Sequence, residues 1–189
     1  FGEYPQALVS DNVLATELAT QAGILPTATN SGSWLSYGYY INSSNSTDFM
    51  WYIDIQHNGN KYRGVYFVSY RPYYTYYDSN TSNTYQDDNG YSIKTVYWFR
   101  YEPIKWRILT EGGGKAFILA ELILDSQDYN FTSNSSNING YSTYANNYAY
   151  SSIRAWLNNE FYSTAFSDLE KAVVSLTTVD NSLATTGYD

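Results

Sequence analysis

Glu102 is the side chain in this sequence that most resembles a general acid. It lies in the string YWFRYEPIKWRIL, residues 97–109, between two tryptophans and directly before Pro103. Aromatic neighbours can bury a carboxyl group and raise its pKa, as a general acid requires. Acid catalysis also needs a second group within reach, and the sequence offers no partner at a recognisable spacing. We therefore interpret Glu102 as a structural carboxylate at the end of a strand, paired with Arg100, Arg107 or backbone N–H groups.

Other residues that could perform chemistry are scarce. His57 is the single histidine, and it precedes Asn58-Gly59, a pair that is typical of a hairpin turn. One histidine cannot form a zinc site unaided, and the chain contains no cysteine that could join it. No serine lies in a Gly-x-Ser-x-Gly nucleophile motif. The sequence therefore predicts a protein that is not an enzyme, and hydrolase activity is the weakest of the hypotheses considered.

Two segments rich in aspartate and asparagine could supply oxygen ligands to a calcium ion. The first is Asp87-Asp88-Asn89-Gly90, and the second lies around Asp125, Asp128 and Asn130. Neither segment matches the EF-hand loop, and Asp and Asn also favour turns for purely conformational reasons. We expect no cofactor, with calcium binding as the open alternative.

Two tyrosine-rich segments are the main indication of ligand binding. The chain contains 23 tyrosines, each of which combines a large apolar face with a hydroxyl group. Rigid aromatic side chains beside adaptable amides are typical of surfaces that recognise other molecules. The candidate ligand-binding residues are Tyr73, Tyr74, Tyr76, Tyr77, Tyr141, Tyr144, Asn146, Asn147 and Tyr148, and Tyr150 ends the second segment. The alternative is that these loops simply pack on themselves.

The composition restricts the class of protein. Hydrophobic residues make up 43% of the 189 residues, and we expect one buried core and a single domain over residues 1–189. The net charge is −8 and the ten Lys and Arg residues are scattered, which argues against nucleic acid as a partner. No apolar run approaches the roughly 20 residues of a membrane-spanning helix. The abundance of Asn, Ser, Thr and Tyr favours an extracellular or cell-surface location.

The N-terminal third predicts a helix followed by a hairpin. Asp11 is a suitable N-cap, apolar residues recur at helical spacing after it, and Gly23 occupies the position of a C-cap. A short strand could follow at residues 34–41. The alternating segments 49–55 and 62–68 flank the Asn-Gly pair, which predicts two antiparallel strands joined by a tight turn.

Further strands are expected in the middle of the chain. Residues 91–99 and 104–109 predict two adjacent core strands joined at Glu102-Pro103. The glycine-rich segment 111–115 predicts a turn. The apolar segment 116–124 suits a central strand, which would be covered on both faces.

The last third predicts helices. Ser152 could cap a helix over residues 153–162, whose apolar side chains fall on one face. Ser167-Asp-Leu-Glu170 is a capping box that opens a second helix through Leu176. The whole pattern predicts an α+β fold with a twisted, mostly antiparallel sheet, about three helices and long polar loops.

Several strings along the chain carry a family resemblance. They are Gly2-Glu-Tyr-Pro-Gln6, Tyr97-Trp-Phe, Glu102-Pro-Ile-Lys-Trp-Arg-Ile-Leu109, Leu124-Asp-Ser-Gln127, Ser152-Ile-Arg-Ala-Trp-Leu-Asn-Asn159, Phe161-Tyr, Ala165-Phe166 and Val179-Asp-Asn181. Through them the sequence resembles an uncharacterised domain of bacterial secreted and surface proteins. That domain is distantly similar to the C-type-lectin-like fold of the sulfatase-modifying enzymes.

The resemblance implies a C-type-lectin-like fold and a bacterial, extracellular or cell-surface protein, and it supplies no catalytic residues. The cysteine chemistry of sulfatase-modifying enzymes is excluded in a chain without cysteine. A Trp-Trp-Leu-Arg-Ser-type string and a Gly-Val-Arg-Pro-type ending usually follow in that family. Neither occurs before Asp189, so we expect a domain that lacks its C-terminal part.

Two functional hypotheses follow. The first is a non-catalytic extracellular recognition or adhesion module that binds a glycan or a protein through the tyrosine-rich loops. The second is a structural surface protein that assembles with itself or whose sheet is completed by a partner strand.

Overall fold

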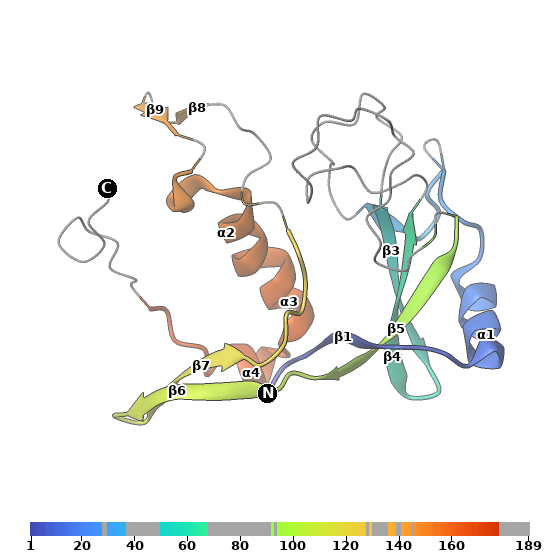
Figure 1. The fold of residues 1–189 in the computed structure, drawn as a ribbon, viewed down its shortest axis with the longest axis horizontal. Helices are drawn as coiled ribbons and strands as arrows, with labels where there is room; N and C mark the ends of the chain where they lie inside the picture. The colour runs from blue at the N-terminus through green and yellow to red at the C-terminus, as the bar shows by residue number, and fades with distance from the viewer. Residues whose placement is uncertain are drawn as a thin grey trace.

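The computed structural model describes residues 1–27, 30–36, 50–67, 92, 94–127, 129, 136–138, 141–144 and 146–177. These residues form an α+β structure of antiparallel sheets and short helices, which confirms the predicted fold class (Figure 1). The strands are β1 (Glu3–Leu8), β2 (Leu35–Ser36), β3 (Met50–His57), β4 (Asn60–Phe67), β5 (Val96–Pro103), β6 (Trp106–Gly112), β7 (Lys115–Ala120), β8 (Ser136–Ile138) and β9 (Tyr141–Thr143). The helical elements are α1 (Asn12–Ala22), the 3-10 turn η1 (Tyr148–Tyr150), α2 (Ser152–Trp156), the π-helical segment η2 (Leu157–Phe161), α3 (Tyr162–Ala165) and α4 (Asp168–Lys171).

The main sheet has five strands in the order β1-β5-β4-β3-β2, and α1 packs on one of its faces. Helix α1 begins where the sequence predicts, because the Asp11 carboxylate accepts hydrogen bonds from the main-chain N–H groups of Val13 and Leu14. Gly23 ends it with a φ of 74°, a conformation that glycine adopts without strain. The predicted helix and both of its caps are confirmed.

The β3–β4 hairpin also forms as predicted. Asn58 and Gly59 have φ values of 49° and 78°, the positive values that a two-residue type I′ turn requires. The turn fixes an uninterrupted register from His57–Asn60 to Met50–Phe67. Alternate residues of these strands therefore face either α1 or the opposite side of the sheet.

The face toward α1 holds the larger hydrophobic core. Its buried members are Leu18, Ala22, Trp34, Trp51, Ile53, Ile55, Tyr62, Tyr66 and Trp98. Gly64 leaves room for the Trp98 ring, since a Cβ atom at Gly64 would lie 2.6 Å from that ring. Such a contact is closer than packed atoms tolerate, so glycine is needed at this point of β4.

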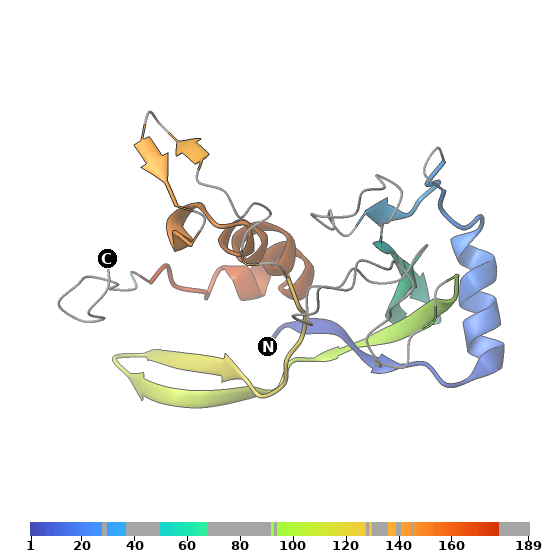
Figure 2. The same ribbon diagram turned by 45° about the horizontal axis from the view of Figure 1, so that its top comes forward.

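The prediction of two adjacent core strands around Glu102-Pro103 is wrong. Strand β5 continues through Pro103 and lies between β1 and β4, whereas β6 leaves the main sheet and pairs with β7. The segment 116–124 is not a central strand either, because β7 belongs to a two-stranded sheet whose apolar side chains are largely exposed. In both views the β6–β7 hairpin projects away from the main sheet on the side of α2–α4 (Figures 1 and 2).

The predicted helix over residues 153–162 exists, with two corrections. Ser151 rather than Ser152 is the N-cap, since the Ser151 hydroxyl accepts the N–H of Arg154. The helix passes through the π-helical segment η2 before it ends at α3. The capping box at Ser167–Glu170 forms, but α4 ends at Lys171 rather than Leu176.

A second, smaller core joins α3 to β1. Its buried residues are Tyr4, Ile104, Ala165 and Phe166. The first two residues of the chain are also fixed at this core. The Gly2 N–H donates to Glu170 Oε1 at 2.6 Å, and the Trp106 indole donates to the Phe1 carbonyl at 2.5 Å.

Candidate functional site

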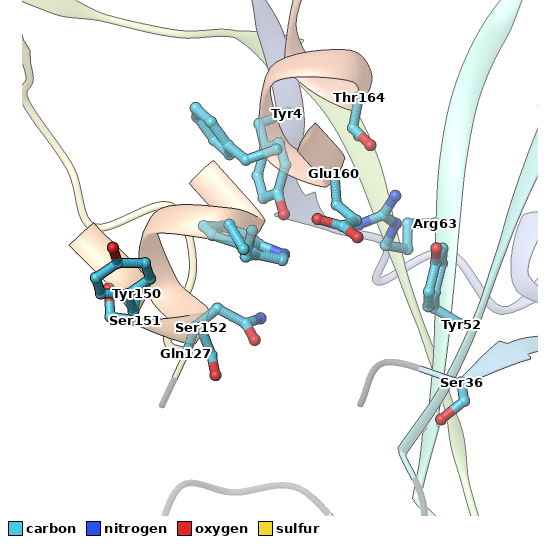
Figure 3. Close-up of a pocket in the computed structure, with 13 residues that line it drawn as sticks. Tyr4, Ser36, Tyr52, Arg63, Gln127, Tyr150, Ser151, Ser152, Glu160 and Thr164 are labelled. Carbon is cyan, nitrogen blue, oxygen red and sulfur yellow. The ribbon is translucent and has the colours of Figure 1, made fainter. Parts of the chain in front are cut away.

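A pocket of about 470 Å³ lies between the main sheet and the α2–η2–α3 helix (Figure 3). One side, here called the sheet wall, consists of Tyr52 from β3, Arg63 from β4 and Tyr4 from β1. The other side, the helix wall, presents Trp156 and Glu160, among other residues. The remaining lining residues are Ser36, Gln127, Tyr150, Ser151, Ser152, Ala155, Phe161 and Thr164.

Arg63 is the centre of the sheet wall. It is opposite Asp54 in the β3–β4 register, on the face away from α1. Its Nε and Nη2 atoms donate to the two Asp54 carboxylate oxygens, each at 2.8 Å. The guanidinium carbon lies 4.4 Å from the centre of the Tyr52 ring, a cation–π distance.

Arg63 stays positively charged in the folded protein although the residue is only 5% exposed. Burial opposes the charged form, but the hydrogen bonds and the charge of Asp54 outweigh burial and raise the pKa of Arg63 above its ordinary value. Arg63 therefore stays charged, and Asp54 neutralises it. The two side chains together carry little net charge, and the planar guanidinium group of Arg63 lines the pocket.

The second polar group of the sheet wall is the Tyr4 hydroxyl. It donates to Asp125 Oδ2 at 2.5 Å, while Asp125 Oδ1 accepts the N–H of Ser126 at 2.7 Å and the amide of Gln127 at 3.1 Å. Burial, followed by the charge of Asp125, raises the pKa of Tyr4. Burial also raises the pKa of Asp125, against the effect of its three hydrogen bonds.

In the described part of the chain, the rings of Tyr4, Tyr52 and Tyr101 lie around Arg63, and all three resist ionisation. Burial is the largest cause of the raised pKa of Tyr52 and of Tyr101, and the charge of Asp54 adds to it. The charge of Glu160 contributes to the shift at Tyr52 as well. These phenols remain protonated at neutral pH, so they act as neutral aromatic surfaces that carry a hydroxyl.

The helix wall adds aromatic rings and one carboxylate. The ring centroids of Trp156 and Phe161 are 5.4 Å apart. The Phe161 centroid is also 5.2 Å from that of Tyr4, so Phe161 connects the helix wall with the sheet wall. Glu160 is exposed, and its carboxylate faces the Arg63 side of the pocket (Figure 3). The Trp156 ring is half-buried and lines the pocket.

Of the residues predicted as the ligand site, Tyr144, Asn146, Asn147 and Tyr148 have described side chains, and none of these four lines the pocket. Tyr73, Tyr74, Tyr76 and Tyr77 lie outside the described residues. The backbone of Tyr141 belongs to β9, and Tyr144 is 72% exposed away from the pocket.

The amide residues between these tyrosines have structural roles. The main-chain carbonyl of Asn146 accepts a hydrogen bond from the Tyr129 hydroxyl at 2.9 Å. The Asn147 side chain caps the turn η1 by accepting the N–H of Ala149. Tyr148 is exposed on that turn, and among the described side chains of this segment Tyr150 lines the pocket.

The predicted calcium ligands can be assessed only in part. Asp125 is already engaged by three hydrogen-bond donors, and Asp87-Asp88-Asn89-Gly90, Asp128 and Asn130 lie outside the described residues. In the part of the chain that the structure describes, no three His, Asp or Glu side chains lie close enough together to hold a metal ion.

Glu102 and His57 both have structural partners. Glu102 accepts a hydrogen bond from Arg100 Nε at 2.7 Å, which confirms its interpretation as a paired strand carboxylate. His57 lies against α1, with Nε2 at 3.1 Å from Glu17 Oε2 and Nδ1 at 3.3 Å from Gln21 Oε1. His57 therefore links β3 to α1, Glu102 is paired within β5, and both residues lie outside the pocket.

The pocket is chemically suited to binding. Aromatic rings line both of its walls, and hydroxyl, amide and guanidinium groups supply donors and acceptors between them. Arg63 is neutralised by Asp54, so Glu160 leaves the lining with an excess of negative charge.

None of the helices in the described part of the chain is long and apolar enough to cross a membrane.

A protein-family model matches the C-terminal part of the chain. Residues 113–189 are similar to a family described as Domain of unknown function (DUF6273). The matched segment contains the helix wall of the pocket but not the sheet wall. Neither the curated proteins nor the solved structures contain a match, so the C-type-lectin-like similarity stays a prediction.

Proposed function

We propose that this chain is a non-catalytic recognition module that binds a neutral, polyhydroxylated ligand, such as a sugar residue of a glycan, in the pocket between the sheet wall and the helix wall. One observation carries the proposal. Aromatic rings and uncharged hydrogen-bonding groups face each other across a pocket in which the cation is already neutralised.

The size and the aromatic lining of the pocket suit a sugar ring. A volume of about 470 Å³ lies within the range of sites for small organic ligands. Tyr52 on one wall and Trp156 on the other offer flat apolar faces to the C–H groups of a ring. Both side chains have few rotatable bonds, so little conformational entropy is lost when they hold a ligand.

The polar groups favour a neutral ligand over an anionic one. Arg63 donates two hydrogen bonds to Asp54, so an incoming anion would have to compete with an existing carboxylate. Glu160 adds repulsion, which is the unfavourable element that excludes a wrong ligand. Hydroxyl groups of a sugar can instead donate to the exposed Glu160 carboxylate at no cost in net charge.

An extracellular or cell-surface location in a bacterium is part of this proposal. The low share of charged residues and the abundance of Asn, Ser, Thr and Tyr support it. In such a location the module would anchor its parent protein on a carbohydrate surface.

The experiment is a binding assay of the intact chain on a panel of neutral and acidic glycans. The wild type is compared with Glu160→Gln, and Glu111→Gln serves as the matched control because Glu111 is also exposed but lies on the β6–β7 hairpin. We expect neutral glycans to bind, and Glu160→Gln to strengthen the binding of acidic glycans relative to neutral ones.

Glu111→Gln should leave the binding profile unchanged. A wild-type preference for acidic glycans, or the absence of binding to every glycan on the panel, would refute the proposal. Equal effects of the two substitutions would show that net charge, rather than the pocket, controls binding.

A further inference from the structure

The β6–β7 hairpin exposes apolar side chains on both of its faces. Phe117 and Leu119 share one face of β7 and are 60% and 56% exposed. Ile108 on β6 pairs with Ile118 on the opposite face, and Ile108 is also exposed. A strand that is apolar on both faces is typical of the interior of a sheet, and a hairpin of two strands is marginally stable in water.

The outer edge of β7 is open to a further strand among the residues that the structure describes, where β7 pairs with β6 alone. The edge of β6 is interrupted by a register shift between Ile108 and Thr110, but β7 runs through this region without an extra residue. Its sequence, KAFILA, contains no proline and has its single charge at one end. Strand edges that avoid association usually carry a proline, a bulge or a central charge.

We propose that a second copy of this chain binds along this edge, through antiparallel pairing of β7 with β7 of the partner. The sequence is self-complementary in the register that places Ile118 opposite itself. Lys115 then lies opposite Glu121 of the partner subunit, and Phe117 lies opposite the partner's Leu119. By two-fold symmetry each of these pairs forms twice.

Both kinds of pair are favourable across adjacent strands. Lys115 and Glu121 have opposite charges, and the two aromatic–aliphatic pairs cover the exposed face of β7. Glu121 already accepts two hydrogen bonds from Arg107 on its own hairpin, at 3.0 and 2.9 Å. Its carboxylate retains lone pairs for Lys115 of the partner subunit.

The product is a closed, four-stranded antiparallel sheet in the order β6-β7-β7-β6. A sheet with a hydrophobic face needs three or more strands for independent stability, which four strands satisfy and two do not. A closed dimer also leaves no further β7 edge to recruit a third copy. This surface does not include the residues that line the pocket, so the dimer and the ligand site are independent proposals.

The first test is the mass of the intact chain in solution, by light scattering after size-exclusion chromatography. We expect twice the 21.6 kDa mass of one chain, with dissociation on dilution. A mass of 21.6 kDa at every accessible concentration overturns the proposal.

The second test fixes the register by disulfide cross-linking. The chain contains no cysteine, so single substitutions give unambiguous products. Under a mild oxidant we expect Ile118→Cys to form a covalent dimer. Ala116→Cys, on the same face, should not, because the partner's Ala120 lies opposite it and the two cysteines are beyond the Cα separation of about 7 Å that a disulfide spans. Cross-linking at Ala116→Cys, or at neither position in a dimeric protein, overturns the proposed pairing.

A charge substitution tests the same surface without a covalent cross-link. Phe117→Lys would place a lysine opposite the partner's Leu119, and we expect its mass to fall to that of one chain. Val13→Lys is the control, since Val13 is 69% exposed on α1. Circular dichroism verifies that both variants are folded. A folded Phe117→Lys dimer, or equal dissociation by Val13→Lys, contradicts the proposal.

Discussion

Replacing Asp54 by Asn tests whether the buried ion pair holds the sheet wall together. Asp54 is the partner that accepts both guanidinium hydrogen bonds of Arg63, at 2.8 Å each. Asparagine keeps the shape of the side chain but removes its charge and one of the two acceptor oxygens. The guanidinium, which is almost fully buried, would then remain charged and would lose the carboxylate that accepts two of its hydrogen bonds.

The expected cost follows from the burial of the two side chains. Removing one partner of a buried ion pair typically costs about 3–5 kcal/mol, because the other charge is left without compensation. Asp54 is itself 30% exposed and water can partly replace it, so we expect the lower end, about 3 kcal/mol. For a chain of this length that loss lowers the melting temperature by about 6–12 °C.

Urea unfolding followed by tryptophan fluorescence measures the free energy of unfolding, since the chain contains five tryptophans. The matched control is Glu102→Gln, because Glu102 is also paired with one arginine, Arg100, but this arginine is 49% exposed. We expect the control to unfold like the wild type. A loss below about 1 kcal/mol for Asp54→Asn, which is the range of exposed pairs, would refute the argument from burial.

Three further predictions concern packing and pH. Gly64→Ala places a Cβ atom 2.6 Å from the Trp98 ring, and urea unfolding should show a loss of about 1–3 kcal/mol, whereas an unchanged stability would mean that the ring moves freely. Hydrogen bonds from main-chain N–H groups lower the pKa of Glu170 from 4.5 to about 2. The charged form is favoured in the folded state, so its contribution is present above pH 4.5 and is lost as the pH falls toward 2. Glu170→Gln should therefore flatten the acid part of the stability–pH curve, and an identical curve would contradict this account. Burial raises the pKa of Tyr4 and Tyr101 above 10, so the stability that depends on their protonated hydroxyls should decline as the pH rises above 10, and a flat free energy of unfolding in that range would contradict it.

The local elements could be predicted from the sequence because short-range physics determines them. The helix α1 begins at a capping aspartate and ends at a glycine, and the β3–β4 hairpin follows from Asn58-Gly59. The capping box at Ser167–Glu170 forms for the same reason. Each of these features depends on residues within a few positions of one another.

The arrangement of the strands could not be predicted in the same way. The pairing of β1 with β5 joins residues separated by about half of the chain, and no local pattern specifies it. The strong apolar character of β7 suggested a central strand, but the described chain leaves it in a two-stranded hairpin. Hydrophobicity indicates that a strand is to be covered, and it does not identify the covering element.

The pocket was missed because its residues come from separate elements. Tyr4, Tyr52 and Arg63 lie on three strands, and the helix wall lies about a hundred residues further along. One signal was present in the sequence. Once the Asn-Gly turn fixes the hairpin, counting back along both strands pairs Asp54 with Arg63, an opposite-charge pair in the middle of two strands. A charged pair at such a position indicates a polar site on that face of the sheet.

The strings that carry the family resemblance have structural roles here. The Gln6 side chain donates to the Glu102 carbonyl at 2.8 Å and ties β1 to β5. Ile104 is buried in the smaller core, and the Trp106 indole fixes the first residue of the chain. Tyr4 is the exception, because it belongs both to this core and to the pocket.

The most direct test of the proposed function is titration calorimetry of the intact chain with methyl glycosides of neutral hexoses. Wild type is compared with Trp156→Ala, which removes the aromatic face of the helix wall, and with Tyr144→Ala, which removes an exposed tyrosine outside the pocket. Our account predicts that at least one neutral glycoside binds the wild type and Tyr144→Ala equally, and that folded Trp156→Ala loses this binding. Retention of binding by Trp156→Ala together with its loss in Tyr144→Ala would contradict the account and would assign recognition to the tyrosine-rich loop instead.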